Sequence, residues 1–465
     1  MKGGRATGRL QGIAAAVAVL GTVALWTWAP AAEEPAFPRG DVVDAQVAFW
    51  TNVYGRWSLS QVAVHDKQCP ALIYEVVDLP GAGGEAYTPA QDAFVRDVRA
   101  AWEGRLAEIE SKVDAGAPLS DQEASLALRV TDACGTDGVR EASLRVRSQR
   151  GLRERFRRGL AVSARYDARF RGIFRDAGLP EDLAFLPHVE SSFQHSARSS
   201  AGAVGVWQFT RATGRKFMRV NAAVDERLDP VASARGAARY LRQAHGVLGT
   251  WPLALTSYNH GVAGMARAQA QFGDDFEAVV RAYDAPTFGF ASKNFYAEFL
   301  AAREVALHPE VYFPEGVSFE EPLSADEVVL PRAMTIHEVQ SRYGVDRATL
   351  RRLNPAWSAK AAAGRIALPS GHRVWLPEGT LAGRRPAAET TVAEAKPESP
   401  RPSTSAKAAK PAHRFHKVRP GDTLWSVAKR YGLEVAELRK MNGLSAKSSR
   451  IRPGQRLRVG YAPQA

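Results

Sequence analysis

The sequence lacks the motifs that identify several common catalytic sites. It has no serine nucleophile elbow, no Walker phosphate loop and no His-Glu-x-x-His zinc helix. The run His188-Val189-Glu190 fits the His-x-Glu half of a zinc deaminase, but that site also needs a downstream Cys-x-x-Cys, and both cysteines lie upstream. These absences argue against all four enzyme classes, and we expect neither a metal nor a cofactor.

Cysteine is scarce, since the chain contains only Cys69 and Cys134. An even pair in a protein that is expected to leave the reducing cytosol predicts a disulfide. Closing a loop of that length would stabilise the fold by about 4 kcal/mol on the chain-entropy model. Two separate buried thiols are the alternative.

Long hydrophobic runs are also missing, and the longest, 13–28, is short of the ~20 residues that a membrane-spanning helix needs. Lys2, Arg5 and Arg9 precede it and small residues follow, which is the order of a secretory signal. We therefore predict a signal peptide over 1–31, with a retained membrane anchor as the alternative. Because no cysteine follows the run, a lipid anchor has no attachment residue.

The composition is that of a folded protein, with 45% hydrophobic and 24% charged residues over 465 positions. It excludes a wholly disordered, collagen-like or multi-pass membrane chain, and the length suggests about three domains. The net charge of +13 indicates an anionic partner. Its excess lies in two stretches, 145–175 and 414–459, which are either solvated surfaces or binding sites for an anionic polymer.

Apolar residues recur at helical spacing through most of the first 307 residues. We predict a helical region over 41–150 and a mainly α-helical domain over 151–307. Within that domain Asp229 precedes Pro230, a cap and a first helical residue that together favour a helix start.

A repeat follows, in which the segment from Thr335 to Asn354 aligns with Thr423 to Asn442 at a constant offset of 88 residues. Each copy is expected to form a strand, two short helices and a strand, over 328–378 and 414–460. The intervening 379–413 is rich in Ala, Pro, Ser, Thr, Lys and Glu, and we expect it to be a flexible linker.

Glu190 is the strongest candidate for chemistry. It lies beside an apolar helical stripe of Leu183, Leu186 and Val189, where desolvation would raise its pKa and suit it to general acid catalysis. Downstream, Trp207, Gln208 and Phe209 offer the flat faces and amide that suit sugar rings. A capped helix with a surface glutamate is the alternative.

At these residues the sequence resembles the mainly α lysozyme-like (goose-type, SLT) domain of lytic murein transglycosylases, closest to the membrane-bound lytic transglycosylase D type. The resemblance runs from about Val47 to Ala302. Two departures are Trp207, where many relatives carry Met, and Ser257, where many carry Ala. The resemblance rests on Glu190-Ser191, Ser199, Gly205-x-Trp207-Gln208-Phe209, Ser257-Tyr258-Asn259-His260-Gly261, the run from Asp225 to Pro230 and the run from Phe290 to Tyr296.

The second repeat copy resembles a LysM domain, a small βααβ module that binds glycans containing N-acetylglucosamine. The match implies that Asp422, Thr423, Leu424 and Asn442 bind glycan. The first copy has Ala333-Met334 where the second has Gly421-Asp422, so it resembles a degenerate LysM module, with a purely structural role as the alternative.

The resemblance implies non-hydrolytic cleavage of the β-1,4 bond between N-acetylmuramic acid and N-acetylglucosamine in peptidoglycan, a carbon–oxygen lyase reaction. Glu190 would protonate the leaving oxygen and then deprotonate the C6 hydroxyl, which gives a 1,6-anhydro sugar. Tyr258 would hydrogen-bond Glu190. The residues implied to contact substrate or line the cleft are Ser199, Trp207, Gln208, Phe209, Tyr258, Asn259 and Tyr296.

Two rival functions stay open: hydrolysis by a lysozyme proper, and a non-catalytic scaffold that binds cell wall through LysM. Sequence does not show whether Asp225 or Asp229 approaches Glu190 as a second carboxylate, and both are expected to be structural. We expect peptidoglycan strands as partner, no nucleic acid, a monomer, and a place in the periplasm or envelope of a Gram-negative bacterium, membrane-associated if the signal is uncleaved.

Overall fold

The computed structural model describes residues 36–81, 84–135, 138–382, 413–418, 423–431, 433, 435–444 and 454–461. The predicted signal peptide and most of the predicted linker lie outside these residues. The chain divides into two compact units, one ending at Gly383 and one beginning at Arg384. Among the described helices none is long and apolar enough to cross a membrane.

The N-terminal region contains a three-stranded antiparallel sheet that the sequence prediction missed. Its strand order is β2-β1-β3. The central strand has no polar alternation because it is buried on both faces, and the edge strand Val146–Arg150 is almost wholly polar, so neither shows the period of two that marks a strand. The strands are β1 (Gln61–Asp66), β2 (Ile73–Asp78) and β3 (Val146–Arg150).

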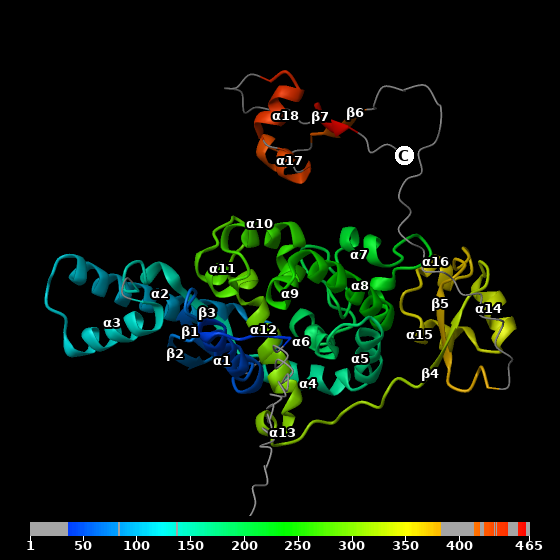
Figure 1. The fold of residues 1–465 in the computed structure, drawn as a ribbon, viewed down its shortest axis with the longest axis horizontal. Helices are drawn as coiled ribbons and strands as arrows, with labels where there is room; N and C mark the ends of the chain where they lie inside the picture. The colour runs from blue at the N-terminus through cyan, green and yellow to red at the C-terminus, as the bar shows by residue number, and fades with distance from the viewer. Residues whose placement is uncertain are drawn as a thin grey trace, which may run out of the picture. The chain divides into compact units, whose positions relative to one another are not determined.

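Helices flank this sheet as predicted. Helix α1 (Asp41–Gly55) precedes it, and α2 (Pro89–Asp114) and α3 (Asp121–Cys134) form a hairpin (Figure 1). Thr88 and Ser120 start the hairpin helices with capping boxes, in which each hydroxyl accepts from a backbone N–H one turn on. A short 3-10 turn, η1 (Ser143–Arg145), returns the chain to β3.

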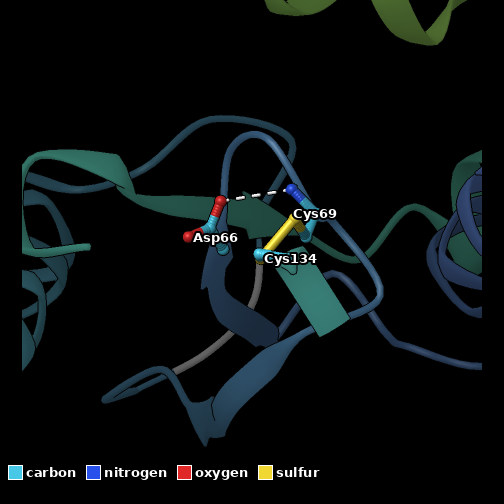
Figure 2. Close-up of side chains that lie close together, drawn as sticks. All are labelled: Asp66, Cys69 and Cys134. Atoms are coloured by element: carbon cyan, nitrogen blue, oxygen red, sulfur yellow. Dashed lines mark hydrogen bonds between the residues drawn. A yellow bond between two sulfur atoms is a disulfide. The ribbon is translucent and has the colours of Figure 1, made fainter. Parts of the chain in front are cut away.

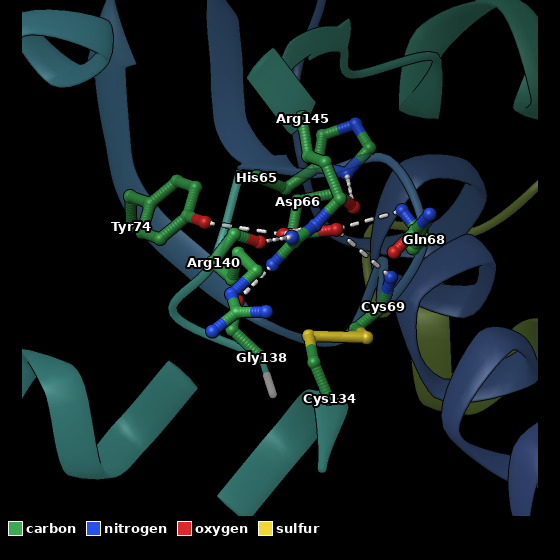
Figure 3. Close-up of a disulfide and its surroundings, with 9 residues drawn as sticks. All are labelled: His65, Asp66, Gln68, Cys69, Tyr74, Cys134, Gly138, Arg140 and Arg145. Carbon is green, nitrogen blue, oxygen red and sulfur yellow. Dashed lines mark hydrogen bonds and ion pairs between the residues drawn. A yellow bond between two sulfur atoms is a disulfide. The ribbon is translucent and has the colours of Figure 1, made fainter. Parts of the chain in front are cut away.

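Cys69 and Cys134 are bonded in the structure and tie the loop after β1 to the end of α3 (Figure 3). Asp66 lies beside them and accepts a hydrogen bond from the backbone N–H of Cys69 (Figure 2) and another from that of Gln68 (Figure 3). Its other oxygen pairs with the buried Arg145 guanidinium at 2.8 Å. The two sulfurs are bonded to each other and the carboxylate is hydrogen-bonded and ion-paired, so this group stabilises the fold and does not bind a metal.

The predicted α-helical domain is present, and its core is continuous with α1. Helix α12 packs against α1, α6 and α9. Asp229 caps α8 as predicted, since its Oδ1 accepts from two backbone N–H groups. Its helices are α4 (Arg153–Ser163), α5 (Asp167–Asp176), α6 (Leu186–Glu190), α7 (Arg211–Phe217), α8 (Pro230–Leu248), α9 (Trp251–His260), α10 (Val262–Phe272), α11 (Phe276–Ala282), α12 (Phe290–Leu307) and α13 (Pro309–Tyr312), with 3-10 turns η2 (Glu181–Phe185) and η3 (Glu226–Leu228).

The first repeat copy packs onto this domain within the same compact unit. Trp375 donates its indole N–H to Asp229 (2.8 Å), and Arg235 forms a two-pronged ion pair with Glu327. The elements are β4 (Ala325–Val329), α14 (Ile336–Tyr343), α15 (Arg347–Leu353), α16 (Ala359–Ala362) and β5 (Arg373–Pro377), with β4 and β5 antiparallel.

The second copy forms the other compact unit and has its own small apolar core. It follows the predicted order with β6 (His413–Lys417), α17 (Leu424–Tyr431), α18 (Val435–Met441) and β7 (Arg456–Tyr461), and β6 pairs with β7. In both copies the side chain of the aligned asparagine acts as a clamp, since it links a helix to the last strand through hydrogen bonds. Asn354 bonds Leu350 and Trp375, and Asn442 bonds Leu438 and Arg458 through backbone atoms.

The basic stretch 145–175 is largely neutralised inside the protein. Eight of its eleven arginines form ion pairs with carboxylates, and Arg150 and Arg169 bond backbone carbonyls instead. Within the described residues only Arg147 forms neither contact. This stretch therefore offers far less free positive charge than the sequence count suggests. The ion-paired members are Arg145, Arg153, Arg155, Arg157, Arg158, Arg165, Arg171 and Arg175.

Candidate active site

Glu190 is the last residue of the short helix α6, which directly follows the 3-10 turn η2. Its side chain is half-buried, and no residue that the structure describes donates a hydrogen bond to its carboxylate. Burial, and then the negative charge of Glu298, raise the pKa of Glu190 to about 8. A carboxyl with this pKa holds its proton at neutral pH, as a general acid must.

The backbone after Glu190 is strained. Ser192 and Phe193 both have positive φ angles, 49° and 57°, which side-chain-bearing residues rarely adopt. The turn is held because Ser191 donates its hydroxyl to the carbonyl of Val206 (2.8 Å). Strain of this kind concentrates at functional sites, and here it fixes the chain that leaves the proposed acid.

Two of the predicted site residues in the loop 197–209 form hydrogen bonds to other residues of the same loop. Gln208 has a φ of 47° and donates its amide to the carbonyls of Ala197 and Gly205. Ser199 is exposed, and its hydroxyl accepts from the N–H of Ala203. The Gln208 amide oxygen and the Ser199 hydroxyl proton are the polar functions left for a ligand.

Gly205 shows why this loop needs glycine. Its φ is +78°, and a Cβ there would lie 2.1 Å from the carbonyl oxygen of Arg227. Any other residue at this position would push the loop away from η3 and displace Gln208.

Two aromatic residues were expected to face sugar, and the structure corrects both. Trp207 is fully buried, with its indole N–H on the carbonyl of Pro230 and its ring against Phe170 and Phe174. Phe209 is also buried. Composition identifies an aromatic residue but not the side of the loop that it faces, and here both rings complete the core.

Tyr258 and Tyr296 also differ from their expected roles. The Tyr258 hydroxyl donates to the carbonyl of Trp207 (2.9 Å) and not to Glu190. Burial, and then the charge of Glu190, raise the pKa of Tyr258. Tyr296 is fully buried and donates to the carbonyl of Pro38, so it does not line a cleft. Asn259 is exposed, and its amide oxygen accepts from Ser292.

Neither aspartate that sequence left open serves as a second acid. Asp225 pairs with Arg227 at 2.7 Å, and Asp229 caps α8 and receives Trp375. Both therefore have structural roles, as expected.

Glu298 is the carboxyl that sequence reasoning missed. It lies half-buried on α12, and burial raises its pKa to about 8. The signal was available, because Glu298 is the lone acid in the apolar run from Phe295 to Ala302, much as Glu190 borders its own apolar stripe. Tyr54 from α1 lies within reach of the charges of both glutamates.

Of the predicted glycan-binding residues in the second repeat, Asp422 lies outside the described residues. Thr423 is exposed. Leu424 is buried in the core of the module, and the Asn442 amide is used by the clamp between α18 and β7, so these two are corrected to structural residues.

Two family models match parts of this chain. Residues 174–281 match the family described as transglycosylase SLT domain, and residues 416–460 match the LysM domain. The chain is 26% identical over 306 residues to membrane-bound lytic murein transglycosylase D from two strains of Escherichia coli, K12 and O6:H1. The alignment covers 63% of this chain and 63% of those relatives, so the chain spans less than two thirds of their length.

Among solved structures, the lytic transglycosylase Slt of Pseudomonas aeruginosa, determined as an inactive mutant, is similar at 18% identity with a TM-score of 0.25. The similarity covers 44% of this chain and 30% of that one.

Proposed function

We propose that this chain, which carries a transglycosylase SLT domain and a LysM domain, is a peptidoglycan lytic transglycosylase. The observation that carries the proposal is Glu190, a half-buried glutamate whose pKa is raised to about 8. It is the last residue of the mostly buried helix α6 and precedes a strained turn inside the SLT match. The similarity to lytic murein transglycosylase D supports the same chemistry.

In the proposed reaction the protonated Glu190 gives its proton to the oxygen of the β-1,4 bond between N-acetylmuramic acid and N-acetylglucosamine as the C1–O bond breaks. The carboxylate then removes the proton of the muramic C6 hydroxyl, whose oxygen bonds to C1 and closes a 1,6-anhydro ring. Glu190 ends protonated, as it began. The nucleophile belongs to the sugar itself, so its effective concentration is high and no water is consumed.

The two aspartates that flank η3 are unavailable as a second catalytic carboxylate, whereas Glu298 has no hydrogen bond or ion pair among the described residues, so the mass of the products decides between this route and hydrolysis. A hydrolase of the two-carboxyl kind needs a second free carboxylate to activate water or attack C1. Asp225 and Asp229 are engaged in structural contacts. The exposed Ser199 and Asn259 and the free amide oxygen of Gln208 are the residues proposed to contact the sugars.

The LysM domain is proposed to hold the enzyme on glycan, and the cell envelope is the proposed location. A cleaved signal at 1–31 and a monomeric state belong to the same proposal. A membrane-associated form would need the N-terminal apolar segment to be retained.

The test is digestion of purified peptidoglycan followed by mass analysis of the released muropeptides. Wild type should release products lighter by one water than those of a lysozyme. Glu190→Gln should release essentially none, a loss of at least roughly 100-fold. Glu181→Gln is the matched control, because Glu181 lies in the same segment but pairs with Arg175 at the surface.

Three outcomes would contradict the proposal. Products of full mass would show hydrolysis. Lysis that is unchanged in Glu190→Gln would remove Glu190 as the acid, and cell-wall binding without any lysis by wild type would show a non-catalytic scaffold.

A further inference from the structure

Arg227 is a buried arginine in the 3-10 turn η3, with 5% of its surface exposed. Its Nε and Nη2 atoms donate to the two carboxylate oxygens of Asp225, at 2.9 and 2.7 Å. This two-pronged pair compensates the charge of the guanidinium and fixes its plane. The third nitrogen, Nη1, lies outside the pair and contacts the loop 197–209, which we call the substrate loop.

Nη1 of Arg227 donates to two carbonyls of the substrate loop. The carbonyl oxygen of Phe209 is 3.2 Å away and that of Gly202 is 3.4 Å away. Gly202 closes the turn that begins at Ser199, because its N–H donates to the Ser199 carbonyl (3.0 Å). Phe209 directly follows Gln208. One guanidinium therefore holds the backbone beside both polar residues of this loop that are proposed to contact sugar.

Two glycines let η3 pack closely against its neighbours. A Cβ at Gly205, in the substrate loop, would lie 2.1 Å from the carbonyl oxygen of Arg227. A Cβ at Gly214, on α7, would lie 2.7 Å from Cδ of the same arginine. Because Arg227 is packed this tightly at its backbone and at its side chain, a shift of η3 must also shift the substrate loop.

The first repeat copy holds the segment that leads into η3. Ala223 and Val224 are buried in the apolar core of this copy. Asp225 donates its backbone N–H to the carbonyl of Ala356 (2.7 Å), and Ser358 donates its own to the carbonyl of Ala223 (2.8 Å). These bonds flank an antiparallel bridge at Val224. The start of η3 is thus anchored in the first copy.

Side chains complete this anchor. Trp357 donates its indole N–H to Nε2 of His372 (3.1 Å). Because an indole only donates, Nε2 accepts and Nδ1 carries the ring proton, 3.3 Å from the carboxylate of Glu226. The other oxygen of Glu226 accepts from the backbone N–H of Arg219 (2.8 Å). Both carboxylate oxygens of the first residue of η3 are therefore held, one of them by the first copy.

We propose that Arg227 is a positioning residue for glycan binding, and that the first repeat copy fixes it in place through η3. This rests on the proposed function, since it takes Ser199 and Gln208 as residues that contact sugar. Among the described residues Arg227 forms no hydrogen bond or ion pair with Glu190, so it acts on binding and not on the acid. The first copy thus contributes to the active site as the support of the substrate loop.

The experiment measures kcat and KM for muropeptide release from soluble peptidoglycan strands. In Arg227→Gln, KM should rise at least roughly 10-fold while kcat and its pH profile stay unchanged, because the loop contacts serve ground state and transition state alike. Arg227→Lys should recover thermal stability, since an ammonium still pairs with Asp225. It should not recover KM, because lysine lacks the second arm that reaches the carbonyls.

His372→Phe tests the part played by the first copy, because it removes the donor to Glu226. KM should rise by roughly threefold, and the double variant with Arg227→Gln should rise no further than Arg227→Gln alone, since both act through η3. Arg235→Gln is the matched control. It breaks the ion pair with Glu327 elsewhere between the first copy and the α-helical domain, and it should leave KM unchanged.

An unchanged KM in Arg227→Gln overturns the inference. A KM that returns to the wild-type value in Arg227→Lys, together with stability, does the same, because it shows a role in folding alone. If Arg227→Gln fails to fold, the comparison of His372→Phe with Arg235→Gln decides the matter, and equal KM values in these two variants overturn the inference.

A second measurement separates this inference from the proposed function. Hydrogen exchange of the substrate loop can be followed with no substrate present, at the N–H groups of Ser199, Val204 and Gly205, which are bonded within the loop. Exchange there should speed up at least roughly 10-fold in Arg227→Gln and change little in α12. Unchanged exchange, or an equal increase throughout the domain, overturns the inference. A wild type that releases no muropeptides would instead refute the proposed function alone.

Discussion

Trp375 of the first repeat copy donates its indole N–H to Asp229, the residue that caps α8 in the SLT region (2.8 Å). Both side chains are buried, at 3% and 6% exposure. Beside them, Trp357 donates to His372, whose other ring nitrogen lies 3.3 Å from Glu226. Buried polar groups of the first copy thus bond residues of the neighbouring domain, which favours a structural role for this copy.

Trp375→Phe should therefore destabilise the protein. The phenyl ring keeps most of the packing but leaves a buried Asp229 oxygen without its donor, which costs about 1–3 kcal/mol. Thermal unfolding at neutral pH measures the loss. Trp102→Phe is the matched control, because it removes an equivalent bond to the exposed Glu75 and should cost less than about 0.5 kcal/mol. Equal effects of the two substitutions would contradict the docking role.

The paired glutamates predict how stability depends on pH. The folded-state pKa of Glu190 and of Glu298 is about 8, above the ordinary value of 4.5. The folded protein therefore holds more protons than the unfolded chain between these values, and stability falls as pH rises from about 4.5 to about 8.

Glu190→Gln removes one of the two carboxyls whose ionisation destabilises the folded protein at high pH. It should be inactive yet melt at least roughly 2 °C above wild type at pH 8.5, with a smaller difference at pH 4.5. Scanning fluorimetry across this pH range tests it, with the surface substitution Glu181→Gln as control. A lower melting temperature for Glu190→Gln than for wild type at pH 8.5 would show that the ionised Glu190 does not destabilise the fold.

These two glutamates also show what sequence could and could not predict. Glu190 was found because an acid beside an apolar helical stripe is conspicuous at a spacing of three and four. Glu298 carries a similar signal, but its relation to Glu190 depends on how α12 packs against α6, which local spacing does not contain. Pairing of this kind comes from tertiary structure.

The misassigned residues have a related cause. Trp207, Tyr296 and Asn442 were expected to touch ligands, yet their polar atoms bond the carbonyls of Pro230, Pro38 and Leu438. A motif shows that a position has a specific residue, but the same residue type serves both to bind a ligand and to satisfy buried backbone. Helix starts, by contrast, depend on adjacent residues, and Asp229-Pro230 was predicted correctly.

Tyr258→Phe should lower activity while keeping the fold. Its hydroxyl holds the carbonyl of Trp207, next to Gln208 in the loop that is proposed to meet substrate. Releasing that carbonyl lets the loop shift, and we expect the turnover number to fall roughly 10- to 100-fold.

Tyr283→Phe is the control, since it removes a hydroxyl that donates to the carbonyl of Gly264. Rates of muropeptide release and circular dichroism on both variants make the comparison. A Tyr258→Phe enzyme as fast as wild type would remove this hydrogen bond from the catalytic arrangement.

The disulfide predicts a selective effect on the N-terminal region. Cys69 and Cys134 are separated by 65 positions, so replacing both with serine should cost about 4 kcal/mol of stability. The bond lies beside the buried Asp66–Arg145 pair, which keeps η1 and the start of β3 in place. Calorimetry with and without reductant tests this loss of stability. Reductant should lower the melting temperature of wild type to that of the double serine variant, and it should leave the melting temperature of that variant unchanged. A wild type that is insensitive to reductant under unfolding conditions would show that the two cysteines do not stabilise the fold through a bond.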